Sequence, residues 1–165
     1  HLNLAAAKFR YGCTDLNLDY IAREPLWQLG EDYNHGTGHG VGYLGNIHEA
    51  PIGFRWKATR DAMCEIEPGM VITNEPGIYI EGSHGIRIEN ELLVRAGEKN
   101  EYGQFLYFEP LTFVPIDLDA LRPELMTEEE KQLLNAYHQS VYEKISPYLE
   151  AEEKEWLKEY TRPVK

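Results

Sequence analysis

Apolar residues along the chain follow two different spacings, which predict strands in one part and helices in another. Residues 69–79 predict a strand of apolar and β-branched residues between a turn at Gly69 and a second turn at Pro76-Gly77, and residues 85–94 predict a second strand. Residues 16–29 instead place apolar side chains at helical spacing, with Pro25 late in the segment and Gly30 as a stop signal. The chain is therefore expected to combine strands with helices.

The segments between these elements are shorter or less regular. Residues 2–10 are expected to form a short helical end, and residues 53–65 an irregular stretch. Residues 102–116 are aromatic and β-branched, but Pro110 and Pro115 limit their pairing, so an edge strand or a bend is predicted. Because aromatic side chains bury large apolar areas, we expect four of them in the core rather than on a cofactor: Phe105, Tyr107, Phe108 and Phe113.

The last part of the chain has a helical pattern. The segment Thr127-Glu128-Glu129-Glu130 is a capping box, and the apolar residues that follow recur at helical spacing up to Pro147. A second helix is predicted over residues 148–160, where the run of glutamates is most simply a solvent-exposed face.

Composition limits the range of functions. A formal net charge of −12 argues against a partner with a phosphate backbone. No apolar run approaches the roughly 20 residues that span a bilayer. The chain has two cysteines, Cys13 and Cys64, in dissimilar sequence contexts. This is too few for a disulfide framework or a thiolate zinc site. We expect a soluble protein with reduced cysteines, without a nucleic-acid or membrane partner.

A catalytic or metal-binding function is first indicated by the glycine-rich segment 35–42 and the residues just after it. His35, His39 and His48 lie close together there, and imidazole is a common metal ligand that also titrates near neutral pH. The glycines leave little bulk, so the backbone could take a positive φ and a ligand could approach closely. A flexible turn with incidental histidines is the alternative, and the clustering of ionisable groups makes it the weaker one.

Carboxylates recur at the ends of the two predicted strands. Glu75 lies where the first strand ends, and alternation in the second places Arg87, Glu89 and Glu91 on one face. Taken alone, this face could be a solvated surface with a weak ion pair. Antiparallel pairing of the strands would, however, bring Glu75 and Glu89 together. With His39 they would form a set of one nitrogen and two carboxylates that suits a divalent metal.

Four ordered motifs resemble those of the M24 metallopeptidases and, more narrowly, of long-form aminopeptidase P, the Xaa-Pro aminopeptidases. The sibling prolidases share the His-Gly-x-x-His and Glu-Pro-Gly elements. The similarity continues through residues 106–112 into the C-terminal tail. The motifs are His35-Gly-Thr-Gly-His39-Gly-Val-Gly, His48-Glu-x-Pro51, Asn74-Glu75-Pro-Gly-x-Tyr79 and Gly85-Ile-Arg87-Ile-Glu89-Asn90.

This resemblance implies the fold class and the domain organisation. The class is α+β, namely the C-terminal portion of a pita-bread fold, with a curved antiparallel sheet and outer helices. Residues 1–116 would be the C-terminal part of the catalytic domain, and residues 117–165 a helical C-terminal extension.

The resemblance also implies a site with two divalent metal ions. His39 and Glu75 would bind one ion, and Glu89 would bridge the two. Manganese is the expected metal, with zinc or cobalt as alternatives, and the carboxylate-rich set is consistent with manganese.

The implied reaction is hydrolysis of the peptide bond before a proline in second position. Glu75 would be the general base for a metal-activated water. His35 and His48 match histidines that bind substrate and assist proton transfer. Arg87 matches an arginine that orients neighbouring carboxylates, and Tyr79 a tyrosine beside the glutamate ligand that contacts substrate.

This sequence departs from the M24 pattern in its set of metal ligands. The M24 family supplies two aspartate ligands and a further histidine from a segment before the region matched here. Asp15, Asp19 and Asp32 are expected to cap or solvate the ends of a helix rather than to replace those aspartates. The chain is therefore expected to be part of a larger enzyme, with an incomplete metal site and little or no activity alone.

The implied enzyme is cytoplasmic, acts on proline-containing peptides and forms a homodimer, with Trp156 and Tyr160 as candidate contact residues. Three other functions stay open. The chain could belong to an Xaa-Pro dipeptidase, to a non-catalytic M24-type binding module, or to a mononuclear enzyme that uses His39, Glu75 and Glu89. The presence of five matching residues argues against the binding module, namely His35, His39, His48, Glu75 and Glu89.

Overall fold

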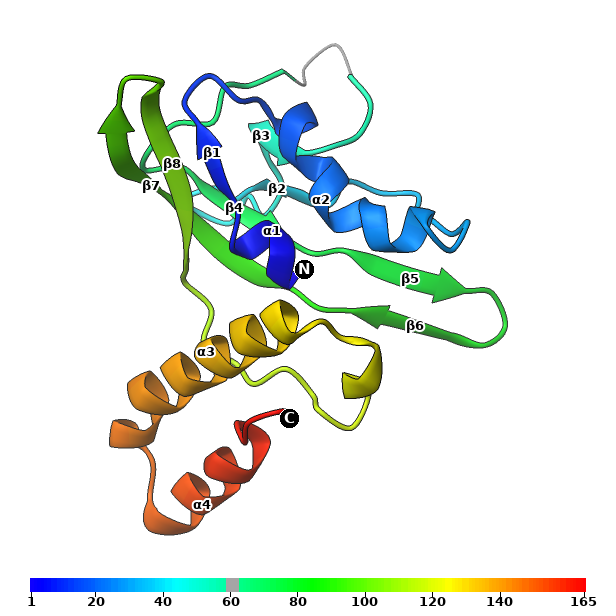
Figure 1. The fold of residues 1–165 in the computed structure, drawn as a ribbon, viewed down its shortest axis with the longest axis vertical. Coiled ribbons are helices and arrows are strands. Elements are labelled where there is room, and N and C mark those ends of the chain that lie inside the picture. Colours follow the sequence, from blue (N-terminus) through cyan, green and yellow to red (C-terminus); the bar gives the residue numbers. More distant parts are fainter. Residues whose placement is uncertain (59–62) are drawn as a thin grey trace. The chain divides into compact units, whose positions relative to one another are not determined.

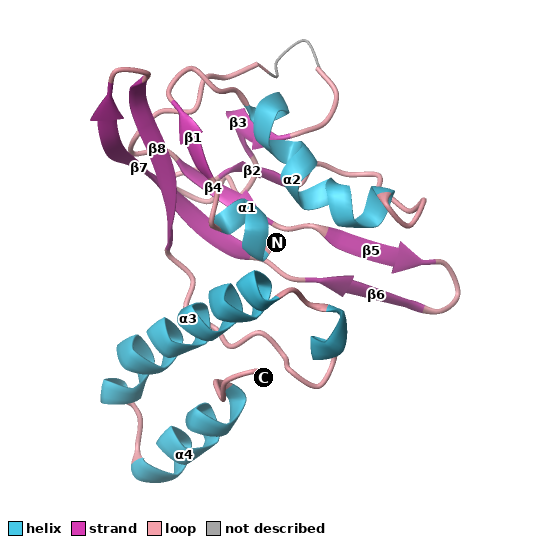
Figure 2. Cartoon of the chain, viewed as in Figure 1, coloured by secondary structure: helices cyan, strands magenta, loops and turns pink. Residues whose placement is uncertain are grey.

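The computed structural model describes residues 1–58 and 63–165. These residues divide into two compact units, one of residues 3–111 together with His1, the other of residues 112–165 together with Leu2. Figures 1 and 2 show the strands gathered in the first unit and the long C-terminal helices in the second. We expected residues 53–65 to be irregular. Residues 53 and 54 belong to a strand instead, and residues 59–62 lie outside the described residues.

Within the described residues, six strands form one sheet in the order β1-β8-β7-β4-β2-β3, and each neighbouring pair is antiparallel. Strands β5 and β6 form a separate hairpin that projects from the ends of β4 and β7 (Figure 1). The strands are β1 (Lys8–Arg10), β2 (Gly38–Gly40), β3 (Glu49–Phe54), β4 (Val71–Asn74), β5 (Gly77–Ile80), β6 (His84–Arg87), β7 (Asn90–Asn100) and β8 (Gly103–Pro110). The antiparallel sheet confirms the predicted α+β class.

Two helices accompany this sheet, α1 (Leu2–Ala5) and α2 (Asp15–Trp27). Helix α2 begins after Thr14, whose backbone N–H donates to the Asn17 side chain at 2.8 Å, and Pro25 is tolerated in its last turn. Its apolar residues pack into the core of the sheet, which confirms the predicted helix. The buried core consists of Leu4, Phe9, Leu18, Ala22, Ile52, Phe54, Ile66, Ile72, Leu92, Val94, Leu106 and Phe108.

The predicted pairing of the two acidic strands is confirmed, but the second strand is broken. Strand β4 pairs with β7 so that Asn74 faces Asn90, and Glu75 and Glu89 are the next residues beyond the paired ends. The first strand ends before Glu75, as predicted, whereas the predicted continuous strand 85–94 is wrong, because residues up to Arg87 belong to the separate hairpin and β7 begins at Asn90. Both glutamates therefore lie just outside the hydrogen-bonded pairing of β4 with β7.

Two other local predictions are also wrong. Residues 8–10 form strand β1 rather than the end of a helix, because they pair with β8. Strand β8 is not an edge strand, since it pairs with β7 on one side and β1 on the other. Of its aromatic residues, Phe108 is buried as expected, whereas the Tyr107 side chain is 43% exposed.

The second unit contains helices α3 (Glu128–Ile145) and α4 (Ala151–Tyr160), with short 3₁₀ turns at Pro123–Leu125 and Ser146–Tyr148. The capping box at the start of α3 is confirmed, because Thr127 Oγ1 accepts from the Glu130 backbone N–H at 3.2 Å and the Glu130 carboxylate accepts from the Thr127 N–H at 2.8 Å. Among the described residues, no helix combines the length and the apolar character that crossing a membrane requires.

Helix α3 also buries a residue that the sequence did not single out. His138 is fully buried, and its Nε2 accepts a hydrogen bond from the Ile116 backbone N–H at 3.0 Å. Burial lowers the pKa of His138, because the charged imidazolium would be desolvated. His138 is therefore a neutral, structural histidine of the second unit.

Candidate metal centre

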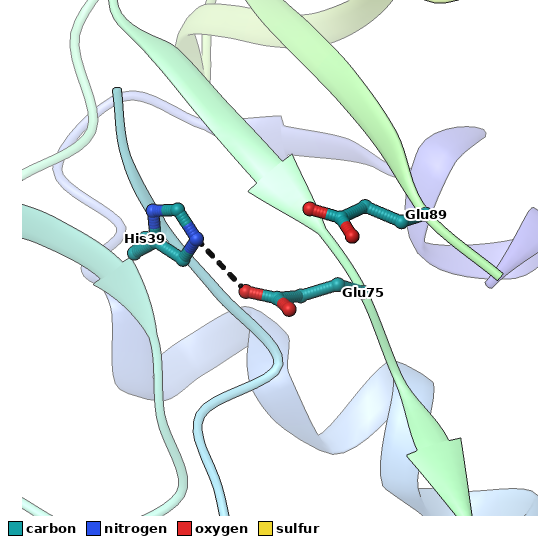
Figure 3. A group of neighbouring side chains, drawn as sticks. All are labelled: His39, Glu75 and Glu89. Carbon is teal, nitrogen blue, oxygen red and sulfur yellow. Dashed lines mark ion pairs between the residues drawn. The ribbon is translucent and has the colours of Figure 1, made fainter. Parts of the chain in front are cut away.

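His39, Glu75 and Glu89 converge from three neighbouring segments of the sheet (Figure 3). His39 lies on β2, Glu75 follows β4 and Glu89 precedes β7. One potential ligand atom from each residue lies within 4.8 Å of the other two. The proximity that the sequence predicted for these three side chains is therefore present.

Hydrogen bonds fix the orientation of His39. Its Nδ1 donates to the Gly40 carbonyl at 2.9 Å, which leaves the lone pair of Nε2 directed at Glu75 Oε1, 3.0 Å away. A carbonyl that holds the other ring nitrogen in this way is the usual means of setting the tautomer of a metal-binding histidine.

Thr73 links His39 to Glu75. Its hydroxyl accepts from the His39 backbone N–H at 3.1 Å and donates to Glu75 Oε1 at 3.2 Å. The backbone N–H of Glu75 in turn donates to the Thr37 carbonyl at 2.7 Å. Both side chains are therefore positioned by the sheet itself, and each is about nine-tenths buried, with exposed fractions of 11% and 15%.

The donor set fits a divalent cation. Nε2 of His39 and Oε1 of Glu75 are both electron-pair donors, so a proton or a cation must separate them at 3.0 Å. Two ligands that each lie about 2.1 Å from one ion, with their bonds at right angles, are separated by about 3.0 Å. One imidazole and two carboxylates form a donor set that manganese and similar ions accept.

Arg87 and Tyr79 lie next to these carboxylates. Arg87 Nε contacts Glu89 Oε2 at 3.1 Å. A hydrogen bond with the Tyr79 hydroxyl, followed by the charge of Glu89, raises the pKa of the Arg87 guanidinium. Arg87 therefore provides a permanent positive charge that orients the Glu89 side chain.

The two other predicted histidines also face this region. The His48 ring is exposed and lies 4.1 Å from the His39 ring, centroid to centroid. The His35 ring lies 5.4 Å from the Tyr79 ring, and its Nδ1 bonds the Gly36 carbonyl. Its Nε2 is buried without a hydrogen-bond partner among the described residues. An unpaired buried nitrogen suits His35 to a ligand that completes its hydrogen bonding.

These side chains line one cavity of about 320 Å³. Its lining residues are His35, Gly36, Gly38, His39, His48, Arg55, Glu75, Tyr79 and Arg87. Every site residue predicted from the sequence is therefore in the lining, except Glu89, which lies beside it within the metal-binding cluster. Arg55 and Thr73 were not predicted, because neither belongs to a charged or histidine-rich motif.

The glycines of the histidine segment have a different role from the one we expected. Neither Gly38 nor Gly40 has a positive φ, and both lie buried in strand β2. A Cβ added to Gly38 would lie 1.9 Å from the Thr73 carbonyl oxygen, and one on Gly40 would lie 2.5 Å from the Glu49 carbonyl oxygen. Glycine is required here because neighbouring backbones approach closely.

The Gly38→Ala variant is expected to lose about 3 kcal/mol of stability, because the new methyl group must displace the backbone that carries Thr73 and Glu75. Urea unfolding followed by circular dichroism measures this loss. Gly97→Ala is the matched control, since its Cβ would approach neighbours no closer than 3.3 Å. Equal stability of the two variants would contradict this account of Gly38.

Behind the histidine segment lies a buried polar network centred on Arg23. This fully buried guanidinium donates to Asp19 and Asp32, both at 2.6 Å, and to the carbonyls of Tyr33 and His35 at 2.8 and 2.6 Å. Its carbon Cζ also lies 3.9 Å from the Tyr33 ring centroid. Arg23 therefore holds the backbone on which His35 is mounted.

Thr37 extends the network towards the candidate metal ligand Glu75. Its hydroxyl donates to Asp19 at 2.6 Å and accepts from the Tyr33 hydroxyl, while its carbonyl accepts from the Glu75 N–H. Burial raises the pKa of Tyr33 to about 12, which keeps its hydroxyl a donor at neutral pH. One continuous chain of hydrogen bonds thus joins helix α2 to the backbone of Glu75.

The expected roles of two of the three aspartates need correction. Asp15 is buried and accepts from the Leu16 backbone N–H at 3.0 Å in the first turn of α2, which agrees with a capping role. Asp19 and Asp32 are instead held by Arg23. Burial acts to raise the pKa of Asp32, but its hydrogen bonds from Arg23 and from the Tyr33 backbone, together with the charge of Arg23, lower it overall. None of the three belongs to the described metal-binding cluster, as expected.

Comparison with known proteins identifies the family. The model of metallopeptidase family M24 matches residues 1–96, and that of the C-terminal region of peptidase M24 matches residues 104–164. The chain belongs to metallopeptidase family M24. This M24 chain is 44% identical over 170 residues to aminopeptidase P2 of Arabidopsis thaliana and 43% identical over 171 residues to a probable Xaa-Pro aminopeptidase P of Coprinopsis cinerea. Each alignment covers 99% of this chain.

Solved structures of related enzymes show the same fold as this chain. X-prolyl aminopeptidase from Caenorhabditis elegans, a cytosolic enzyme with a di-nuclear active site, superposes on 99% of this chain with a TM-score of 0.89 and 39% identity. Xaa-Pro dipeptidase from Bacillus anthracis superposes on 71% of the chain with a TM-score of 0.52 and 35% identity. The M24 chain thus has part of the pita-bread fold, as the motifs implied.

The M24 chain spans only about a quarter of these relatives. It covers 23% of the Arabidopsis protein and 27% of both the Coprinopsis protein and the C. elegans structure. The Bacillus structure is covered to 29%.

Proposed function

We propose that this chain forms part of a metal-dependent aminopeptidase that releases the N-terminal residue from peptides with proline in second position. The observation that carries the proposal is the convergence of His39, Glu75 and Glu89 in a chain of the M24 family. Relatives named Xaa-Pro aminopeptidase P, each aligned over almost the whole chain, favour this substrate class over others.

His39, Glu75 and Glu89 would hold the metal, with Glu89 placed to bridge two ions. The di-nuclear site of the C. elegans enzyme supports two divalent ions, and the carboxylate-rich set favours manganese. When bound, the ions would supply Lewis acidity that polarises the scissile carbonyl and acidifies water. The family resemblance implies two aspartate ligands from a segment before the matched region, and we propose that these would complete the pair. No aspartate among the described residues belongs to the cluster.

The chain's own residues would handle protons and substrate. Glu75 Oε2 is available as a proton acceptor, since Oε1 faces His39 and Thr73. His35, with its unpaired Nε2, and the exposed His48 would contact the peptide and donate or accept protons around the reacting carbonyl. Arg87 would orient Glu89, and Tyr79 would contact substrate beside His35.

An Xaa-Pro dipeptidase is the nearest alternative, because the Bacillus dipeptidase shares part of the fold. The two activities differ in the peptides they accept. An aminopeptidase cleaves longer peptides with proline in second position, whereas a dipeptidase requires the free carboxylate of that proline. A mononuclear enzyme would bind one ion tightly to His39, Glu75 and Glu89 alone, and a non-catalytic module would bind peptides without cleaving them.

The test compares the 165-residue chain with a polypeptide that also contains the two aspartates. We expect the longer protein to bind two manganese ions per chain and to release alanine from Ala-Pro-Ala, but not from Ala-Ala-Ala. The chain alone is expected to bind metal weakly and to show almost no cleavage. Cleavage restricted to Ala-Pro would favour the dipeptidase, and one tightly bound ion in the short chain would favour the mononuclear enzyme.

Three further aspects belong to the same proposal. Residues 1–116 would contribute to the catalytic domain, and residues 117–165 would form the extension. Trp156 and Tyr160, whose rings lie 4.6 Å apart and are 55% and 37% exposed, are suited to a homodimer contact. The cytosolic C. elegans enzyme supports a cytoplasmic location.

A further inference from the structure

A second cavity of about 300 Å³ adjoins the candidate metal centre. It shares three residues with the metal-side cavity, His35, Gly36 and Arg55, so a peptide bound at the metal could extend into it. Its lining consists of Arg23, Asn34, His35, Gly36, Arg55, Trp56 and Lys57. Neither the motifs nor the proposed metal chemistry assigns a role to the part formed by residues 55–57.

The cavity is cationic although the chain is strongly acidic. No carboxylate is part of the described lining, and within the described residues no ion pair engages Arg55 or Lys57. Asp15 lies near enough for the charge of Arg55 to affect its pKa, but it is fully buried and outside ion-pair distance. Among the residues that the structure describes, two positive charges thus line a cavity with no carboxylate at ion-pair distance, in a chain whose net charge is −12.

Arg23, in contrast, is not available to a ligand. Its guanidinium is fully buried and already donates to Asp19, Asp32 and two backbone carbonyls. The charge of Arg23 is therefore already neutralised, whereas Arg55 and Lys57 form no ion pair with the residues described outside 59–62.

Aromatic contacts help to hold Lys57 in place. Its Nζ lies 4.1 Å from the centroid of the Trp56 ring, and the edge of that ring system packs against Trp27, with centroids 6.1 Å apart. A cation placed over an aromatic face loses part of its freedom before any ligand arrives. Asn34 adds a side-chain amide to the same cavity.

We propose that this cavity, through Arg55 and Lys57, binds a carboxylate of the peptide substrate and so gives the enzyme a preference for acidic or short peptides. The inference rests on the proposed function, because it takes the ligand to be a peptide held at the metal side. A volume of about 300 Å³ accommodates one side chain or one peptide terminus. A planar guanidinium matches the geometry of a carboxylate.

The carboxylate has two sources, the C-terminus of a short peptide or an acidic side chain, and matched peptides separate them. Isothermal titration calorimetry of the metal-free 165-residue chain compares Ala-Pro-Ala with Ala-Pro-Ala-amide, and Ala-Pro-Glu-amide with Ala-Pro-Gln-amide. We expect the peptide with the engaged carboxylate to bind about 10-fold or more tightly than its neutral counterpart, as a charge-assisted hydrogen bond provides. The pair that shows the difference identifies the source.

Substitutions then assign the preference to the cavity. Arg55→Gln and Lys57→Gln should each weaken binding of the carboxylate peptide about 10-fold and leave the neutral peptide unchanged. Lys99→Gln, which removes an exposed charge on β7 outside the cavity, should change neither. The proposal is overturned if charged and neutral peptides bind equally, if neither binds, or if Arg55→Gln and Lys57→Gln weaken both peptides alike.

The same peptides separate this inference from the proposed function. In the longer protein that contains the two aspartates, Arg55→Gln should lower kcat/KM for the carboxylate peptide alone. Carboxylate-dependent binding without any cleavage would refute the aminopeptidase and keep the cavity. Cleavage without a charge preference would refute the cavity and keep the aminopeptidase.

Discussion

The Glu75→Gln variant is expected to lose at least about 10³-fold in kcat/KM for Xaa-Pro peptides, because a general base alone contributes about 10² to 10⁴-fold and a metal ligand is lost as well. Glutamine keeps the shape of the side chain and can still accept from Thr73. What it loses is the negative charge that faces His39 Nε2 at 3.0 Å. The measurement is steady-state hydrolysis of Ala-Pro-Ala by the protein that contains the two aspartates.

Glu98→Gln is the matched control for this variant. Glu98 lies on the same sheet, on β7, but is exposed and pairs only loosely with Lys8 at 3.4 Å. Its substitution should leave kcat/KM within about 2-fold of the parent, since an exposed pair contributes little. If Glu75→Gln retained more than a tenth of the parent activity, Glu75 would be neither the base nor an essential ligand.

The Arg23→Met variant is expected to lose about 3–5 kcal/mol of stability, the cost of leaving a buried charge without its partner. Asp19 is fully buried and would keep only the hydrogen bond from Thr37. The carbonyls of Tyr33 and His35 would lose a donor at the same time. Urea unfolding of the 165-residue chain, monitored by circular dichroism, gives the difference directly.

A double variant distinguishes an electrostatic loss from a simple loss of packing. Adding Asp19→Asn to Arg23→Met removes the stranded charge, so the two changes together should be at least about 1 kcal/mol less destabilising than their sum. Arg95→Met controls for the loss of a surface guanidinium, because Arg95 pairs with Glu109 where both side chains are about half exposed. Strict additivity of Arg23→Met and Asp19→Asn would show that the pair does not act as a unit.

Much of the candidate centre could be predicted because its residues lie in short, ordered motifs. Alternation and turn signals predicted that the strands carrying Glu75 and Glu89 pair antiparallel, and the register of β4 and β7 confirms this. The end of the first strand at Glu75 was predicted, but the break before Asn90 was missed, because a strand pattern does not reveal where its partner changes. The hairpin beyond that break has apolar and β-branched residues of the same type as the sheet.

The supporting network could not be predicted from the pattern. Asp19 and Arg23 are spaced i and i+4 on a helix, and this spacing is equally common in exposed pairs of little energetic consequence. Only the fold shows that both are buried behind the histidine segment. Strand β8 was assigned to an edge for a similar reason, since its second partner, β1, lies almost a hundred residues earlier in the chain.

The register of β4 against β7 has a consequence for how metal and fold affect each other. Glu75 and Glu89 would reach a common ion only while Asn74 faces Asn90, because a shift by one residue would turn one carboxylate to the opposite face. An ion shared with His39 would therefore cross-link three separate stretches of chain in that one alignment. Metal binding would therefore be thermodynamically linked to the correct pairing of β4 with β7. A chelator should then remove the metal and also lower the stability of the central strands.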